Sequence, residues 1–240
     1  MTGPLFHVKI CGVTTPQAAR LVAAAGADAV GLNFVAGSPR RLEVAAARGV
    51  AAAVPPGILK VGVFAGSSPA EIRSVVSVVG LDAVQLHGHL FATGEHEVVD
   101  APEMCAALER LPVIRAVRLE HAADPFAAAR RWIDLARRAG AAPALALVDA
   151  AVPRGTEAGR LGGTGARADW AAIAGAPALP VPLAVAGGLT AENVAAAIAA
   201  SGCRAVDTAS GVESAPGVKD EVLTRAFVAA ARRALGLAGG

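Results

Sequence analysis

Short apolar runs recur along the chain, and each is followed by turn residues and then by an Ala-rich segment with the apolar spacing of a helix. Eight runs are strand candidates: residues 7–11, 29–34, 59–64, 83–87, 112–117, 144–149, 182–187 and 204–208. The helical segments between and after them span about 16–23, 43–53, 69–79, 101–110, 124–139, 169–175, 191–201 and 219–236. Strands that alternate with helices in this way indicate parallel βαβ units.

Eight such units in 240 residues predict a (β/α)8 TIM barrel, because the eighth unit allows the sheet to close. The alternative is an open, doubly wound sheet. No shift in composition marks a boundary, so we expect a single domain over residues 1–240. Two long loops, 87–100 and 149–168, interrupt the rhythm, and the sequence leaves open whether they form a lid or an interface.

Composition narrows the class of protein. Hydrophobic residues make up 54% of the chain and aromatic residues only 3%, so Ala, Val and Leu must fill the core. A net charge of +2 does not suggest nucleic acid or an anionic membrane as a partner. The 3 cysteines lack CxxC spacing, which argues against a disulfide framework or a zinc cluster. The same cysteine usage fits a reducing, cytoplasmic setting, and the sequence shows no signal peptide or membrane span. The sequence leaves open whether the protein is a monomer or a homodimer.

Polar residues gather where the predicted strands end, which is where TIM barrels place their active sites. The first strand ends in Cys11 and Gly12, the fourth in Gln85 and His87, and the sixth in Asp149. A reactive cysteine needs an open rim, and the position of Cys11 beside Gly12 fits one without deciding for it. A small buried hydrophobic residue is the alternative.

Two glycine segments point to a phosphate ligand. AGGLTAEN (186–193) follows the seventh strand and contains Gly187 and Gly188, and ASGVE (209–213) follows the eighth and contains Ser210 and Gly211. The loops after strands seven and eight form the usual phosphate site of this fold, through backbone N–H groups and helix N-termini. Together the two segments predict phosphate binding.

Several longer segments resemble those of the phosphoribosylanthranilate isomerases of tryptophan biosynthesis. The matching segments run in order along nearly the whole chain: KICGVT (9–14), GADAVGLNF (26–34), SPRRL (38–42), VGVF (61–64), VQLHG (84–88), LVDA (147–150), GGTG (162–165), ADW (168–170), AGGLTAENV (186–194) and AVDTASGVESAPGVKD (205–220). One departure is Ala209, where the family usually has the first serine of a pair.

The resemblance implies an Amadori rearrangement of N-(5-phosphoribosyl)anthranilate by general acid–base catalysis, without a redox centre, metal, nucleotide or other cofactor. It makes Cys11 the base and Asp149 the acid, and it assigns Arg40 to the anthranilate carboxylate. The neighbouring Arg41 leaves open which arginine reaches in. Gln85 and His87 should line the mouth of the barrel, since residues two apart share a strand face.

These roles set electrostatic requirements. A thiol with a pKa of about 8.5 is mostly protonated at neutral pH, and cationic neighbours would raise its thiolate fraction. Asp149 must instead hold a proton near neutral pH, which requires desolvation or a nearby negative charge. The phosphate and carboxylate of the substrate are both candidates for that charge.

Lys9 raises a rival interpretation, because a lysine inside a barrel can form a Schiff base, as in an aldolase. Asp207 ends the eighth strand, which neighbours the first in a closed barrel, so we predict a charged Lys9 held close to Asp207. Such a lysine is a poor nucleophile, and Asp207 is also a candidate to bind a sugar hydroxyl. Another phosphosugar-processing barrel and a catalytically silent phosphate-binding barrel stay open as alternatives. Four further residues are predicted to serve packing: Cys105, Cys203, Trp132 and Trp170.

Overall fold

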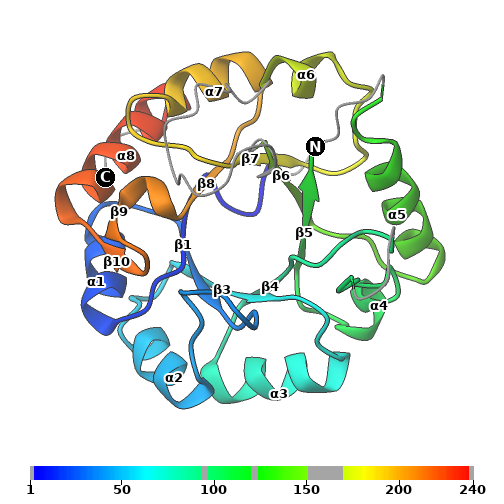
Figure 1. Cartoon of the computed structure of the whole chain (residues 1–240), viewed down its shortest axis with the longest axis horizontal. Helices are drawn as coiled ribbons and strands as arrows, with labels where there is room; N and C mark the ends of the chain where they lie inside the picture. The colour runs from blue at the N-terminus through cyan, green and yellow to red at the C-terminus, as the bar shows by residue number, and fades with distance from the viewer. Residues whose placement is uncertain (1–2, 93–96, 120–123, 151–169, 238–240) are drawn as a thin grey trace.

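Eight parallel strands close into a barrel surrounded by a ring of helices (Figure 1). The computed structural model describes residues 3–92, 97–119, 124–150 and 170–237. The strands are β1 (Val8–Cys11), β2 (Ala29–Asn33), β3 (Leu59–Phe64), β4 (Ala83–Leu86), β5 (Val113–Arg118), β6 (Leu145–Asp149), β7 (Leu183–Ala186) and β8 (Val206–Thr208). The barrel closes where β1 pairs with β8, with Lys9 in register with Asp207. The predicted TIM barrel is confirmed, and the open sheet is wrong.

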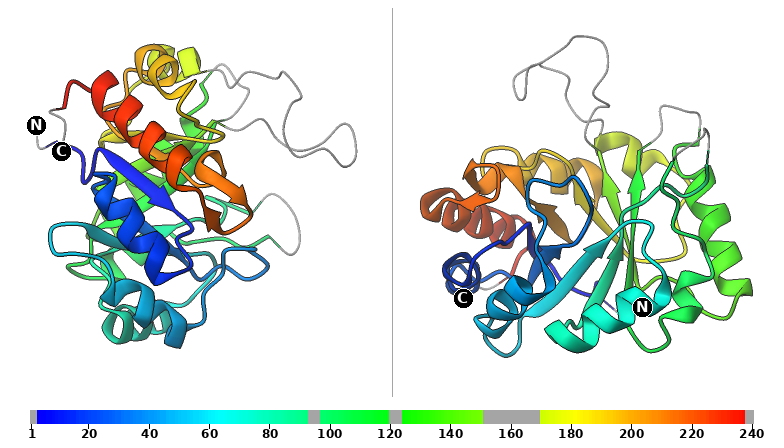
Figure 2. Two further views of the ribbon diagram at one scale, coloured as in Figure 1. Left: turned by 90° about the vertical axis from the view of Figure 1, so that its left-hand side faces the viewer. Right: turned by 60° about the horizontal axis from the view of Figure 1, so that its bottom comes forward.

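The outer helices match most of the predicted segments. They are α1 (Pro16–Ala24), α2 (Val44–Ala52), α3 (Pro69–Val79), α4 (Met104–Ala107), α5 (Ala127–Arg138), α6 (Trp170–Gly175), α7 (Val194–Ser201) and α8 (Glu221–Ala234). Helices α1 and α3 begin as expected, with Thr15 and Ser68 accepting backbone N–H bonds just before a proline. Figure 2 shows α8 beside both α1 and α7, so the last helix completes the ring.

Two features differ from the sequence-based expectation. The helix predicted over 101–110 is only the single turn α4, because Pro102 precedes it and Glu109 takes a left-handed φ of 57°. After β8 the chain forms a 3₁₀ turn (Ser210–Val212) and a hairpin, β9 (Glu213–Ala215) and β10 (Val218–Lys219), which the sequence did not predict. Most of the long loop 149–168, together with its GGTG segment, and residues 93–96 of loop 87–100 lie outside the described residues.

Alternation along the strands separates an inner from an outer core. Outward residues such as Val30 and Val84 pack beneath the helices, whereas inward residues of the same strands form a second cluster inside the barrel. That inner cluster consists largely of small residues and includes Ala29, Ala83 and Leu147. The inward positions next along the chain are Gly31, Gln85 and Asp149. Apart from the buried Lys9 on β1, which is in register with Ala29, the barrel interior is therefore apolar in its body and polar at the carboxyl ends of its strands.

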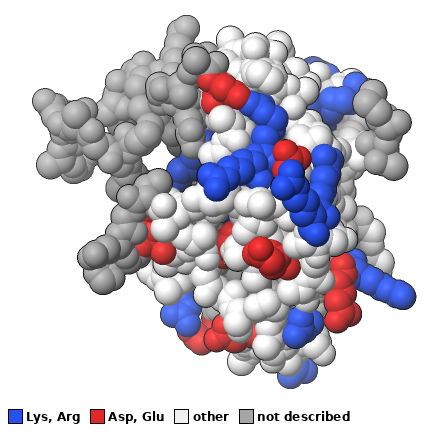
Figure 3. Space-filling view, turned by 90° about the vertical axis from the view of Figure 1, so that its right-hand side faces the viewer, with Lys and Arg blue, Asp and Glu red and all other residues white. Residues whose placement is uncertain are grey.

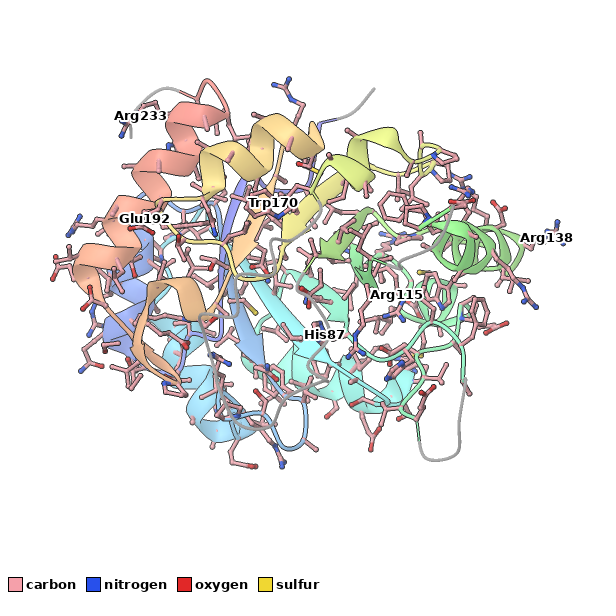
Figure 4. The ribbon with its side chains drawn as sticks, turned by 45° about the horizontal axis from the view of Figure 1, so that its top comes forward. His87, Arg115, Arg138, Trp170, Glu192 and Arg233 are labelled. Atoms are coloured by element: carbon pink, nitrogen blue, oxygen red, sulfur yellow. The ribbon has the colours of Figure 1, made fainter. Side chains whose placement is uncertain are left out.

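A buried arginine fixes the end of β4. Arg115 on β5 is fully buried and donates to the carbonyls of Leu86 and Gly88, at 2.7 Å in each case. Its guanidinium also lies 3.6 Å from the Asp100 carboxylate and 5.0 Å from the ring centroid of Trp132, whose indole N–H donates to the Asp100 carbonyl. In Figure 4, His87 lies towards the middle of the barrel end and Arg115 beside it on the α5 side.

Asp100 ties this cluster to two loops. Its carboxylate accepts the backbone N–H groups of Gly66, after β3, and Gly88, after β4, at 2.8 and 2.6 Å. Burial lowers the pKa of Arg115 to about 10, although the Asp100 charge opposes the shift, so the arginine stays protonated at neutral pH. The returning end of loop 87–100 is therefore anchored beneath the mouth of the barrel.

The face of the molecule at α5 gathers basic side chains, with acidic groups among them (Figure 3). Two arginines of α5 donate to backbone carbonyls of the segment that leads into β7: Arg130 to Pro177 and Arg137 to Pro180, at 2.9 and 2.7 Å. These cations thus help to attach α5 to the next unit of the barrel. Within the described ranges, no helix is long and apolar enough to cross a membrane.

The Asp100 anchor leads to a stability prediction. Asp100→Asn should lower the free energy of unfolding by about 3–5 kcal/mol, because Arg115 then lacks its buried counter-charge and one of two backbone N–H groups loses its acceptor. Urea denaturation measures the change. Asp134→Asn, at an exposed position of α5, is the matched control and should stay within about 0.5 kcal/mol of the parent. Equal stabilities for the two variants would contradict the anchoring role.

Candidate active site

The predicted chemistry-bearing side chains converge at one end of the barrel. Cys11 and Asp149 are the last residues of β1 and β6, and Asp207 is the middle residue of β8. Gln85 lies inside β4, and His87 directly follows that strand. All of them fall on the inward-facing alternation of their strands, so the closed barrel brings them around a common mouth.

Lys9 and Asp207 form the predicted pair. The Lys9 ammonium lies 2.9 Å from the Asp207 carboxylate, and the side chains are 0% and 8% exposed. Burial is the largest influence and would lower the pKa of Lys9, but the charges and hydrogen bonds of Asp207 and Cys11 together outweigh it, so the pKa lies above its ordinary value. Lys9 is therefore a charged partner of Asp207 and not a neutral amine nucleophile.

Cys11 is placed by a glycine on the neighbouring strand. A Cβ at Gly31, which pairs with Cys11, would lie only 2.7 Å from the sulfur, so the absence of a side chain there makes room for the thiol. Desolvation raises the pKa of Cys11, while the charges of Lys9 and Lys219 lower it without cancelling the rise. The expected cationic neighbours are present, but the unliganded protein holds Cys11 mainly as the neutral thiol.

Arg40 lies at the mouth beside Cys11, whereas Arg41 lies outside it. Gly12 has a φ of +72°, and a Cβ there would lie 2.3 Å from Cδ of Arg40, so the arginine stem crosses directly over this glycine. Arg41 is largely exposed and pairs with Glu43 at 3.3 Å. Of the two candidate arginines, the geometry favours Arg40.

Gln85 and His87 contact one another. The Gln85 amide nitrogen lies 3.3 Å from Nδ1 of His87, and its oxygen is buried without a hydrogen-bond partner among the described residues. His87 is open to solvent, yet the surrounding walls lower its pKa, mainly by desolvation and against the opposing charge of Asp149. The imidazole is therefore neutral at pH 7. Donation from Gln85 to Nδ1 leaves the ring proton on Nε2, towards which a ligand oxygen could be held.

The two glycine loops lie against each other. Gly187 and Gly188 have φ values of 94° and 64°, in the region that favours glycine. A Cβ at Gly211 would lie 1.8 Å from the carbonyl oxygen of Leu189, which also accepts the Thr208 hydroxyl at 2.7 Å. The loops after β7 and β8 thus form one surface, and Ser210 is exposed on it.

Several residues of the site were not singled out from the sequence. Glu213 and Lys219 had a signal, because both lie in the quoted segment that ends in PGVKD. Arg115 was also visible, as a charge in the middle of an apolar strand. The role of Gly31 had no signal, because it depends on strand register. Among the described residues, no group of three or more His, Cys, Asp or Glu side chains is placed to hold a metal ion.

The state of Cys11 can be tested by alkylation. The rate of its reaction with iodoacetamide should rise with pH through a midpoint above the ordinary thiol value of about 8.5, because the thiolate is the nucleophile and desolvation raises the pKa. Lys219→Met should move the midpoint higher still. Peptide mass spectrometry gives the rate, with the buried Cys105 and Cys203 as unreactive internal controls. A midpoint below the ordinary value would show that the cations dominate.

Comparisons with known proteins agree with this geometry. The family model described as N-(5'phosphoribosyl)anthranilate (PRA) isomerase matches residues 8–230. The N-(5'-phosphoribosyl)anthranilate isomerase of Myxococcus xanthus is 41% identical over 226 residues, which cover 94% of this chain and 96% of that protein. The corresponding crystal structure from Thermotoga maritima superimposes with a TM-score of 0.76 at 34% identity, covering 97% of this chain and all of the other.

A second crystal structure, of a phosphoribosyl anthranilate isomerase in complex with reduced 1-(o-carboxyphenylamino)-1-deoxyribulose 5-phosphate, has a TM-score of 0.71 and 32% identity, with coverage of 97% of this chain and 100% of its own. Fold, motif order and sequence identity thus agree over nearly the whole chain. The chain belongs to the N-(5'-phosphoribosyl)anthranilate isomerase family.

Proposed function

We propose that the protein isomerises N-(5-phosphoribosyl)anthranilate to 1-(2-carboxyphenylamino)-1-deoxyribulose 5-phosphate in the biosynthesis of tryptophan. One observation carries the proposal: a thiol and a carboxyl group, Cys11 and Asp149, end β1 and β6 of a closed barrel in a chain of this family. The reaction needs one acid and one base at different atoms of the sugar. Two groups on separate strands of the barrel meet that need.

Asp149 is the general acid of this scheme. Its proton goes to the ring oxygen of the furanose while the nitrogen lone pair forms the C1–N double bond and the C1–O bond breaks. The ring thus opens to a protonated Schiff base. The substrate brings two anionic groups into the mouth, and negative charge nearby favours the protonated form of a carboxylic acid. His87, neutral and close enough to experience the charge of Asp149, is placed to bind a sugar oxygen.

Cys11 is the general base. Its thiolate takes the proton from C2, and the electrons of that bond form the C1–C2 double bond as the iminium nitrogen becomes neutral. Transfer of a proton from the C2 hydroxyl to C1 then completes the ketone. Lys9 and Lys219 both favour the thiolate and so oppose the desolvation that holds the sulfur neutral in the free protein. Asp207, held by Lys9, is a candidate acceptor for a sugar hydroxyl.

The two anionic ends of the substrate have separate sites in this proposal. The planar anthranilate carboxylate pairs with the guanidinium of Arg40, whose fork suits that shape. The phosphate binds the surface that the two glycine loops form, at Gly187, Gly188, Ser210 and Gly211. Backbone N–H groups serve there, so Ala209 in place of a serine removes one hydroxyl without removing the site.

The wider setting follows from the same assignment. We infer a single catalytic domain over residues 1–240, which is supported by a family match that spans residues 8–230. All three cysteines are free thiols, as is usual in a reducing cytoplasm. One related structure is of monomers made from the dimeric Thermotoga maritima isomerase, which supports testing this chain for a homodimer.

A coupled assay tests the proposal. The unstable substrate is generated in the cuvette, and loss of its fluorescence measures turnover. Cys11→Ser and Asp149→Asn should each lower kcat by about 10²–10⁴-fold with much smaller changes in KM, because each removes a proton-transfer group. Absence of turnover by the pure, folded parent protein would overturn the assignment.

Matched controls separate chemistry from folding. Cys203→Ser removes a sulfur outside the mouth, and Asp134→Asn removes an exposed carboxylate on α5. Both should retain the parent kcat. An undiminished Asp149→Asn enzyme would show that another group is the acid.

A further inference from the structure

Glu213 is the shared partner of two cations at the mouth of the barrel. Its carboxylate accepts from Nε and Nη2 of Arg40 at 2.8 and 2.5 Å, and from Nζ of Lys219 at 2.7 Å. The side chain is only 3% exposed. Burial alone would raise the pKa of Glu213, but the bonds from Arg40 and Lys219 bring it below its ordinary value, so the acid is charged.

The geometry of the Arg40–Glu213 pair leaves part of the guanidinium available. A guanidinium has five N–H donors in one plane. Glu213 accepts from Nε–H and from one N–H of Nη2. These two donors form the side edge of the guanidinium. Nη1 donates no hydrogen bond to any described residue, and the arginine side chain is 20% exposed. The end edge, between Nη1 and Nη2, therefore keeps N–H donors that suit a second, bidentate carboxylate.

Charge balance also favours a second anion at Arg40. Burial lowers the pKa of Lys219, while the bond to Glu213 at 2.7 Å and the Glu213 charge favour its protonated form. With that ammonium protonated, Arg40 and Lys219 carry two positive charges against the single negative charge of Glu213, so the group of three is cationic. Without Lys219, Glu213 would neutralise Arg40. With Lys219 present, the guanidinium is both held by one carboxylate and attractive to another.

Lys219 extends the arrangement to the loop after β8. Its ammonium also donates to the Ala209 carbonyl at 3.0 Å, directly before Ser210, and its side chain has no exposure. The hairpin that carries Glu213 and Lys219 is fixed in turn, because the Thr14 hydroxyl donates to the Gly217 carbonyl at 2.6 Å. One hairpin thus connects Arg40 with the loop to which we assign phosphate binding.

We propose that Glu213 is a positioning residue that binds the side edge of the Arg40 guanidinium. Lys219 offsets the negative charge of Glu213. The end edge of the guanidinium is thereby left to select substrates with a planar carboxylate. The inference rests on the proposed function, because it takes the anthranilate carboxylate as the ligand of Arg40. Neither Glu213 nor Lys219 needs to touch the substrate. The hairpin thus makes the enzyme specific for a sugar phosphate that carries a carboxylated aryl amine over the one that carries an unsubstituted anilino group.

The test compares two ligands. Calorimetry measures the Kd of the product, 1-(2-carboxyphenylamino)-1-deoxyribulose 5-phosphate, and of its anilino counterpart, which lacks only the carboxylate. For Glu213→Gln, the Kd of the product should rise about 10- to 100-fold, the range expected for loss of a well-oriented charged contact, while the Kd of the counterpart should change by less than about twofold. Glu221→Gln, in an exposed pair with Arg225, is the matched control and should change neither.

A second, conservative variant distinguishes loss of positioning from loss of folding. Glu213→Asp keeps the charge but is one methylene too short to hold Arg40 and Lys219 together, and it should show a smaller loss with the same dependence on the ligand carboxylate. Thermal unfolding and circular dichroism confirm that the variants compared are folded. Turnover should show a rise in KM with a smaller change in kcat.

The outcomes distinguish the two proposals. If the parent isomerises its substrate and prefers the carboxylated ligand, but Glu213→Gln keeps that preference, the positioning role is overturned while the function stands. Equal weakening of both ligands by Glu213→Gln and Glu213→Asp would also overturn it, as a merely structural effect. If the parent neither turns over substrate nor prefers the carboxylate, the proposed function itself fails.

Discussion

The buried ion pair between Lys9 and Asp207 is the interaction on which the site depends. It lies in register across β1 and β8, where the sheet closes on itself. Two buried charges are costly to desolvate, and removing either partner would leave the other uncompensated inside the barrel. The pair therefore favours a closed barrel in one register. It also brings a permanent positive charge close to Cys11 on the next inward position of β1.

At the mouth of the barrel, nearby positive charges and burial act in opposite directions on the pKa of Cys11. Lys9 and Lys219 stabilise the thiolate of Cys11, yet burial still raises its pKa. The same cations attract anions, so in the proposed function these side chains serve substrate recognition as well as proton transfer. Small residues make this crowding possible: Gly31 gives room to the sulfur, and Gly12 lets the Arg40 stem cross beside it.

The sequence alone predicted the architecture and the residues at the ends of the strands, because period-two alternation and the βαβ rhythm are local patterns. The contact of Lys9 with Asp207 was also predictable, since closure makes β1 and β8 neighbours. Contacts between loops were not. The hydrogen bonds between Glu213 and the side edge of Arg40 join positions 173 residues apart along the chain, and no local sequence pattern specifies them. The short α4 was missed because an apolar, helical spacing over 101–110 does not reveal that Glu109 adopts a left-handed conformation.

The anchoring of Asp100 bears on how such a barrel can change during evolution. The chain leaves β4 at Gly88 and is fastened again at Asp100, and Arg115 holds both points against β5. A segment whose two ends are fixed can lengthen at small entropic cost, because loop closure entropy grows only logarithmically with length. His87 lies between the end of β4 and Gly88, so it precedes the first of the two fixed points. New residues can therefore accumulate between these points, and acquire new roles, without displacing a side chain of the mouth.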